Sequence, residues 1–151
     1  MALVEVEILR VLRNSYVFLL NHGATGVTAV VDPGTAGPII TAIDEKAWRP
    51  PRMLLCTHHH ADQVGGNLEL RRSYECEIYG PEAEADRIPG LTKGIKGGDK
   101  ITLGSAWCEV IDLPGHTAGG VGYYFAENKA LFCGDVLYQL GCGRILPGKA
   151  E

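Results

Sequence analysis

Three consecutive histidines stand directly after a short apolar segment, and this junction constrains the chain more than any other feature of its sequence. The segment 53–56 has the length and apolar character of a brief buried strand. In an extended backbone, side chains two residues apart leave on the same side, so His58 and His60 point together while His59 points elsewhere. Two imidazoles placed in this way can share one metal ion.

Further polar residues also follow strand-like segments. Asp62 lies two residues beyond His60. His116 comes after a Pro-Gly turn, and Asp135 comes after a Cys-Gly pair. Loops at strand ends usually carry catalytic groups, and imidazole and carboxylate ligands suit Zn²⁺, Fe²⁺ or Mn²⁺. An open coordination position would let a bound water lose a proton near neutral pH, so the pattern predicts a metal-dependent hydrolase site.

The spacing of apolar residues predicts a mixed α+β fold. Strands are expected at residues 4–12, 15–20, 27–31, 53–56, 77–79, 99–103, 106–112, 120–125 and 130–133. Helices are expected at residues 36–48 and about 63–72, with a short helical turn at 81–86 and a loop after Pro89. Mixed strands and helices favour helices packed outside a sheet sandwich.

Size and composition indicate one globular domain over residues 1–151. A chain of 151 residues buries about 68–70% of the surface that its unfolded form exposes. Apolar residues make up 46% of the chain, yet no apolar run is long enough to span a bilayer. The first eight residues alternate apolar and charged side chains and lack the features of a signal peptide, which predicts a cytoplasmic protein.

Charge and cysteine content exclude several classes of function. The net charge is −4, and no basic cluster is longer than Arg71-Arg72, so we expect neither nucleic acid nor a membrane as a partner. The five cysteines are scattered and form no C-x-x-C pair. This pattern argues against disulfides and against a closed structural zinc site, and it fits a reducing compartment.

Other candidate residues have weaker signals. His22 and His59 are predicted to be surface or supporting groups rather than ligands, and Gly65-Gly66 to let the following helix approach the site. Cys142 is predicted to pack rather than to act as a nucleophile, because no histidine lies near it in sequence. Arg144 has two open roles, binding an anionic substrate through charge-assisted hydrogen bonds or forming a surface ion pair.

The motifs T-H-H-H-A-D, P-G-H-T, L-F-C-G-D and G-C-G-R resemble those of glyoxalase II, the hydroxyacylglutathione hydrolases of the metallo-β-lactamase superfamily. The resemblance extends over R-N-S-Y, V-D-P-G and Y-G-P, and so over nearly the whole chain. It implies an αββα sandwich, a binuclear zinc or iron centre, and hydrolysis of S-D-lactoylglutathione. The implied roles are first-metal ligands at His58, His60 and His116, a bridging carboxylate at Asp135, and a second-metal ligand at Asp62.

The chain departs from the family pattern at the second metal. Gln63 stands where the family motif T-H-x-H-x-D-H ends in histidine, and an amide is a poorer zinc ligand than imidazole. The family's other second-metal histidine has no counterpart, because no histidine follows His116. Leu146 also replaces the usual aromatic residue after G-C-G-R. We therefore expect one tightly held ion, with Asp62, Asp135 and a doubtful Gln63 at the second position.

The resemblance also implies that the chain is a C-terminally truncated relative. The last part of the second half of the sandwich would be missing, together with the C-terminal helical domain that carries much of the glutathione site. An incomplete sheet exposes an edge and apolar surface. A homodimer is therefore an expectation.

Three functions remain open from the sequence. The first is a hydrolase of thioesters, with glutathione-derived thioesters as one candidate class, Asp62 and Asp135 as catalytic carboxylates, and Asp62 orienting or deprotonating the water. The second is a mononuclear iron enzyme like the persulfide dioxygenases, which use two histidines and an aspartate. The third is a truncated or degenerate domain that binds metal without efficient catalysis.

Overall fold

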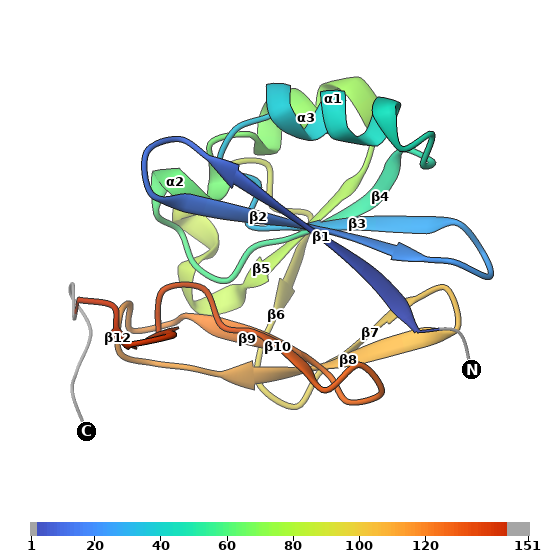
Figure 1. Cartoon of the computed structure of the whole chain (residues 1–151). Coiled ribbons are helices and arrows are strands. Elements are labelled where there is room, and N and C mark those ends of the chain that lie inside the picture. The colour runs from blue at the N-terminus through green and yellow to red at the C-terminus, as the bar shows by residue number, and fades with distance from the viewer. Residues whose placement is uncertain (1–2, 145–151) are drawn as a thin grey trace.

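The computed structural model describes residues 3–144 and arranges their strands in two stacked sheets (Figure 1). The first sheet has six strands in the order β1-β2-β3-β4-β5-β6, and the second has four in the order β10-β9-β8-β7. Two helices, α1 and α3, cover the outer face of the first sheet. The described residues therefore form a layer of helices, a sheet and a second sheet.

The first sheet combines an antiparallel and a parallel half. Its strands are β1 (Val4–Val11), β2 (Ser15–His22), β3 (Val27–Val31), β4 (Pro51–Leu55), β5 (Glu77–Pro81) and β6 (Lys93–Ile95). The first three pair antiparallel, whereas β3, β4, β5 and β6 pair parallel, because helices return the chain between them. The carboxyl ends of β3, β4 and β5 consequently lie at one edge of the sheet.

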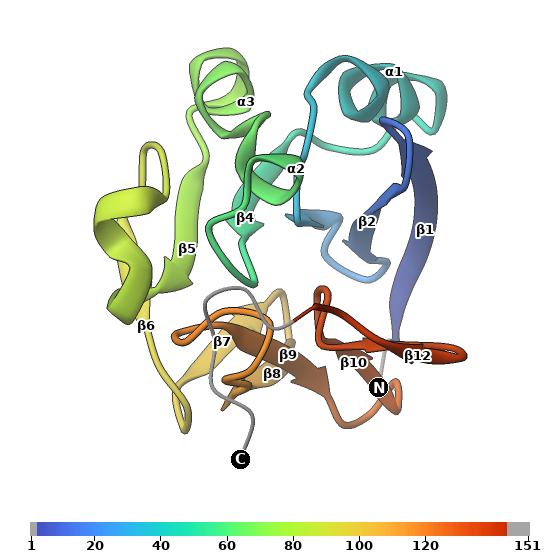
Figure 2. The same cartoon turned by 90° about the vertical axis from the view of Figure 1, so that its left-hand side faces the viewer.

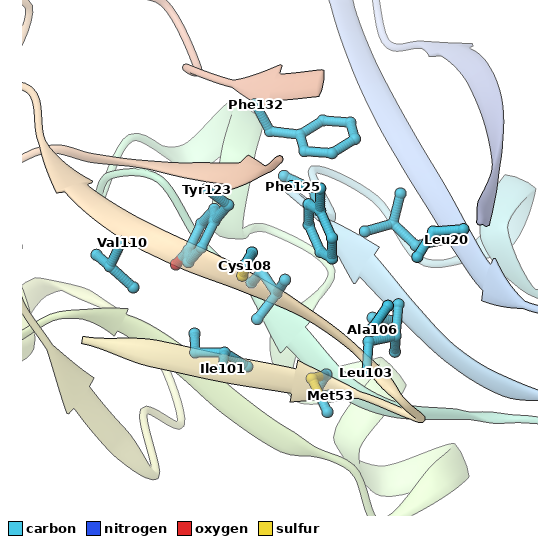
Figure 3. Packing of buried hydrophobic residues seen from close by; sticks show 14 of the residues in the cluster. Leu20, Met53, Ile101, Leu103, Ala106, Cys108, Val110, Tyr123, Phe125 and Phe132 are labelled. Atoms are coloured by element: carbon cyan, nitrogen blue, oxygen red, sulfur yellow. The ribbon is translucent and has the colours of Figure 1, made fainter. Parts of the chain in front are cut away.

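The second sheet is antiparallel throughout and has one buried face. It consists of β7 (Lys100–Leu103), β8 (Ala106–Asp112), β9 (Val121–Phe125) and β10 (Ala130–Phe132). Side chains of β7 and β8 alternate between buried and exposed, as expected for a sheet with one face against a core. Figure 3 shows Leu20 and Met53 of the first sheet packed toward Phe125 and Leu103 of the second. This core holds the two sheets together.

The helices pack against the opposite face of the first sheet. Helix α1 (Gly37–Glu45) has a proline in its first turn, where a missing N–H costs nothing, and it buries Ile39 and Ile43. Helix α3 (Asn67–Tyr74) buries Leu70 in the same cluster. Within residues 3–144 no helix lies on the outer face of the second sheet, so three layers of the expected αββα sandwich are present.

The prediction of a single helix at about residues 63–72 is wrong in one respect, because the chain forms two helices there, α2 (Ala61–Val64) and α3. The Gly66 N–H bonds to Pro33 O at 2.7 Å instead of continuing the helix. A Cβ at Gly65 would lie 2.5 Å from Gly34 O. The two glycines therefore allow contact with the loop before α1, rather than with the site as the sequence suggested.

Three other predictions require correction. The region after Pro89 was expected to be a loop, but it contains the edge strand β6. Ile95 is the one buried residue of this strand, so the sequence has no apolar pattern there that would indicate a strand. A short 3-10 helix, η1 (Glu82–Arg87), precedes it. A small ribbon of β11 (Leu137–Tyr138) and β12 (Gly141–Cys142) was not predicted, and Cys142 is exposed there instead of packed, because the ribbon has no covered face.

His22 was predicted to be a surface or supporting residue, but it is completely buried at the far end of β2. Its Nδ1 lies 2.7 Å from Thr25 Oγ1, and its Nε2 lies 3.0 Å from Ser105 Oγ. Both ring nitrogens are thus bound by hydroxyl groups, one in the turn after β2 and one in the turn after β7.

Within residues 3–144, no helix is long and apolar enough to cross a membrane.

Candidate metal centre

Three imidazoles converge at the edge where the parallel strands end. His58 and His60 lie in the loop after β4, and His116 lies in the loop between β8 and β9. The possible ligand atoms of the three rings all lie within 4.8 Å of one another. The rings meet edge to face, with interplanar angles of 82° and 87° at His58. Figure 2 looks toward this edge, with α2 above the loops of the second sheet.

The Asp135 carboxylate completes the group. Its Oδ2 lies 3.7 Å from His58 Nε2 and 3.5 Å from His116 Nε2, while His116 Nε2 lies 3.0 Å from His60 Nδ1. Two ligands about 2.0–2.1 Å from one tetrahedral ion are separated by about 3.3 Å. These spacings are those of ligands that surround a common ion.

An unpartnered nitrogen also indicates an ion at this position. His58 Nε2 is buried and has no hydrogen-bond partner, although buried polar atoms are normally paired. Burial, reinforced by His60 and His116, lowers the pKa of His58 to about 3, so the ring is neutral and offers a lone pair. Three imidazoles and one carboxylate fit a divalent ion such as Zn²⁺.

A chain of hydrogen bonds behind His58 sets its tautomer. The buried Asp32 carboxylate, at the end of β3, accepts bonds from the Thr57 N–H at 2.8 Å and from the Thr57 hydroxyl at 2.9 Å. The Thr57 oxygen lies 2.9 Å from His58 Nδ1. Because the Thr57 hydroxyl donates its hydrogen to Asp32, its oxygen accepts a hydrogen bond from His58 Nδ1. His58 Nε2 then carries the free lone pair toward the site.

Burial opposes the charge on Asp32. It raises the pKa of this carboxyl to about 7, even though Thr57 hydrogen bonds favour the ionised form. The sequence indicated Asp32 only as part of a family motif and gave it no role. The structure places it directly behind the ligand loop.

Glu84 is a second supporting residue, and the sequence did not indicate it. It lies in η1, beyond the end of β5, and its side chain is completely buried. Its Oε2 accepts bonds from the His59 N–H at 2.9 Å and lies 2.8 Å from His59 Nδ1. Its Oε1 accepts a bond from the Gly119 N–H at 3.2 Å. The His59 ring is thus held by Glu84, and it packs edge to face against the His60 ring with the ring centroids 4.8 Å apart.

Gln63 and Asp62 lie on the other side of Asp135. The Gln63 amide donates from Nε2 to Asp135 Oδ2 at 3.3 Å, and its buried Oε1 has no partner. The Ser15 hydroxyl donates to Asp62 Oδ2 at 3.3 Å. Burial and the charge of Asp62 raise the pKa of Asp135. The Gln63 amide thus donates to the same Asp135 oxygen that faces His58 and His116.

This arrangement can be compared with known proteins. The family model of the metallo-beta-lactamase superfamily matches residues 10–150. The chain belongs to this superfamily. Among curated relatives, the hydroxyacylglutathione hydrolase of Methylococcus capsulatus is 46% identical over 149 residues, and that of Rhodospirillum rubrum is 41% identical over 150 residues. Each alignment covers 99% of this chain and 58% of the relative, so the chain spans just over half of their length.

Solved structures of the superfamily share the fold at low sequence identity. ETHE1 from Myxococcus xanthus aligns with a TM-score of 0.81 and 22% identity, covering 93% of this chain and 61% of that chain. The BLEG-1 B3 metallo-beta-lactamase aligns with a TM-score of 0.80 and 24% identity, covering 93% and 76%. The metallo-β-lactamase fold expected from the sequence is confirmed.

Arg144 contacts the superfamily site through its backbone. His116 Nδ1 donates to the Arg144 carbonyl, which leaves His116 Nε2 free to face the other ligands. The Arg144 side chain is exposed and, among residues 3–144, forms no ion pair. The ion pair considered from the sequence is therefore not formed within this region, and substrate binding stays a prediction. Leu146 lies outside the described residues.

A cleft opens beside Asp135 on the side of Gln63. Its volume is about 670 Å³, within the range of small-molecule sites. Side chains from β2, β10 and the β11–β12 ribbon line it, including Tyr16, Phe18, Leu131, Leu137 and Tyr138. The cleft thus borders the candidate site at Gln63 and Asp135, and part of its wall is aromatic and aliphatic.

Proposed function

We propose that the chain carries the ion site of a thioester hydrolase of the hydroxyacylglutathione hydrolase type. The observation that carries this proposal is the convergence of three imidazoles with the Asp135 carboxylate, which also borders an open cleft. The identity of 41–46% to hydroxyacylglutathione hydrolases supports the same chemistry. A glutathione-derived thioester is the proposed substrate class.

We propose that His58, His60, His116 and Asp135 hold one ion, with zinc favoured and iron or manganese as alternatives. When bound, the ion polarises the thioester carbonyl and lowers the pKa of a coordinated water to about 7. Thr57 and the Arg144 carbonyl keep two of the imidazoles in the tautomer that this requires. Asp62 Oδ1, the oxygen not bound by Ser15, is the proposed acceptor of the water's proton.

Gln63 supports a single secure ion. Its amide N–H points at Asp135 Oδ2, and an N–H group cannot coordinate a cation. Among residues 3–144, the groups beside Asp135 that could still bind a second ion are the unpartnered Gln63 oxygen, the Asp62 carboxylate and the other oxygen of Asp135. We propose that the second position is weak or empty of tightly held metal.

The test uses protein purified with zinc and then desalted. Elemental analysis should give about one equivalent per chain, and two full equivalents would overturn the single-site proposal. The loaded protein should hydrolyse S-D-lactoylglutathione, and His116→Ala should reduce this turnover at least tenfold because one ligand is lost. Absence of turnover in metal-replete wild type would favour the reading as a binding domain without efficient catalysis. Oxygen uptake with glutathione persulfide would favour the dioxygenase reading.

We further propose that the chain folds as one domain and forms a homodimer. Strand β10 lies at the edge of the second sheet, and its Leu131 side chain is 41% exposed. Exposed sheet edges of this kind favour pairing with another strand. Light scattering at micromolar concentration should give a mass near twice 16.2 kDa, and a stable monomer would contradict it. The cytoplasmic location stays a prediction from the sequence.

A further inference from the structure

Glu84 is a buried carboxylate that lies outside the ligand set and has no place in the chemistry proposed above. Its residue is 1% exposed, and its side chain contacts two different loops. One loop carries His58 and His60, and the other carries His116. A buried carboxylate is costly unless its oxygens are bound, and here both of them are.

Each oxygen of Glu84 serves one loop. Oε2 accepts from the backbone N–H of His59, the residue between the two paired ligands, and contacts the His59 ring. Oε1 accepts from the N–H of Gly119, three residues after His116. The approach is close, because a Cβ on Gly119 would lie 2.9 Å from Glu84 Cγ. The carboxylate thus spans the gap between the two loops.

A second link joins the same loops at their base. The Val121 N–H donates to Thr57 O at 2.9 Å. One such bond fixes the loops at a single point, about which they could still turn. With Glu84 in place the loops are held at two points, and the positions of His60 and His116 relative to each other are set.

We propose that Glu84 is a positioning residue that holds the two ligand loops at the separation an ion requires. The inference rests on the proposed ion site and concerns its affinity rather than its activity. A carboxylate is needed for this, because only it offers an acceptor oxygen to each loop. A glutamine of the same shape has one acceptor, and its NH₂ group would face an N–H of the other loop.

The experiment measures zinc affinity by competition with a chromophoric chelator, using the full chain. Glu84→Gln should weaken zinc binding by roughly 10–100-fold, as substitutions behind metal ligands usually do. The Co²⁺-substituted protein should show a shifted visible absorption spectrum, since the ligand geometry changes. Glu82→Gln is the matched control: Glu82 lies in the same 3-10 helix, and its exposed carboxylate pairs with the exposed Lys96 at 3.7 Å.

Thermal unfolding of the metal-free proteins separates positioning from general stability. A Glu84→Gln protein that is folded and binds zinc as tightly as the wild type would overturn the inference. If that variant does not fold, Gly119→Ala tests the other contact, because its Cβ would lie 2.8 Å from Ala83 Cβ and 2.9 Å from Glu84 Cγ and would push the His116 loop away from η1. It should also weaken zinc binding at least tenfold, and unchanged affinity would overturn the inference. The wild type tests the proposed ion site by itself: if it binds no zinc, the ion-site proposal fails, whatever Glu84 does.

Discussion

At the scale of single residues, the site depends on groups that never touch the ion position. Asp32 and Thr57 fix the tautomer of His58, and Glu84 links the loops on either side. Such partners orient a ligand and raise its basicity, and their loss commonly costs as much affinity as a poor ligand does. The metal affinity of the centre is therefore expected to depend largely on the buried hydrogen bonds behind the imidazoles.

Thr57→Val removes the hydroxyl between Asp32 and His58 while keeping the side-chain shape. We expect zinc affinity to fall roughly 10–100-fold, because His58 Nδ1 loses its acceptor and the ring is no longer oriented. The free energy of unfolding should also fall by about 1–3 kcal/mol, because Asp32 keeps only the backbone bond from residue 57. Chelator competition and urea unfolding measure the two effects.

Thr102→Val provides the control for this substitution. Thr102 lies on the exposed face of β7, an edge strand of the second sheet, so neither free energy should change by more than the usual surface effect of about 0.5 kcal/mol. Equal zinc affinity in Thr57→Val and wild type would contradict the assigned role of the hydroxyl.

The ligand residues could be predicted from the sequence, whereas their supports could not. His58, His60 and His116 follow apolar segments at recognisable spacing, and the structure brings them together. Glu84 has no such signal, because it stands between two alanines in a turn and its burial depends on the packing of η1 against two distant loops. His22 shows the same limit, since only tertiary packing reveals that it is a buried residue bound by two hydroxyl groups.

At the scale of elements, strand ends and glycines decide where the loops lie. The apolar pattern predicted β3, β8 and β9 closely, because β8 alternates buried and exposed residues while β3 and β9 are short, almost fully buried segments. It could not predict that one helix would break into α2 and α3, since the cause is contact with the distant loop before α1. Strand β6 was missed for a related reason, because a single buried isoleucine gives no pattern.

Gly66→Ala tests the break between α2 and α3. The added Cβ would lie 2.8 Å from Pro33 O and 3.0 Å from Ala36 N, and backbone atoms cannot move aside as a side chain can. We expect a loss of about 1–3 kcal/mol in the free energy of unfolding, the usual effect of overpacking. For a protein of this size this is roughly 2–4 °C in Tm for each kcal/mol.

Gly37→Ala is the matched comparison. Gly37 begins α1, is exposed, and has no atom within 4 Å of the position of an added Cβ. Alanine should therefore be neutral or stabilise by up to about 1 kcal/mol through the unfolded chain. Equal effects of the two substitutions would show that the contact at Gly66 is not tight.

At the scale of the whole molecule, the ion site spans the two sheets. His58 and His60 leave the first sheet, whereas His116 and Asp135 leave the second. The core shown in Figure 3 and the bond from the Tyr123 hydroxyl to Cys56 O, 2.6 Å long, hold the sheets in register behind these loops. The overall sandwich was predicted because mixed strands and helices favour helices packed outside a sheet sandwich, and because the motifs resemble those of a family with this fold.

This division of ligands between sheets ties the ion to the folding equilibrium. Neither sheet alone carries more than half of the four donors, so the unfolded chain has no preformed site and binds the ion only by closing long loops. The concentration of free zinc in the surroundings then enters the stability of the protein as RT ln(1 + [L]/Kd). Any core substitution that loosens the two sheets becomes, by the same linkage, a substitution that releases metal.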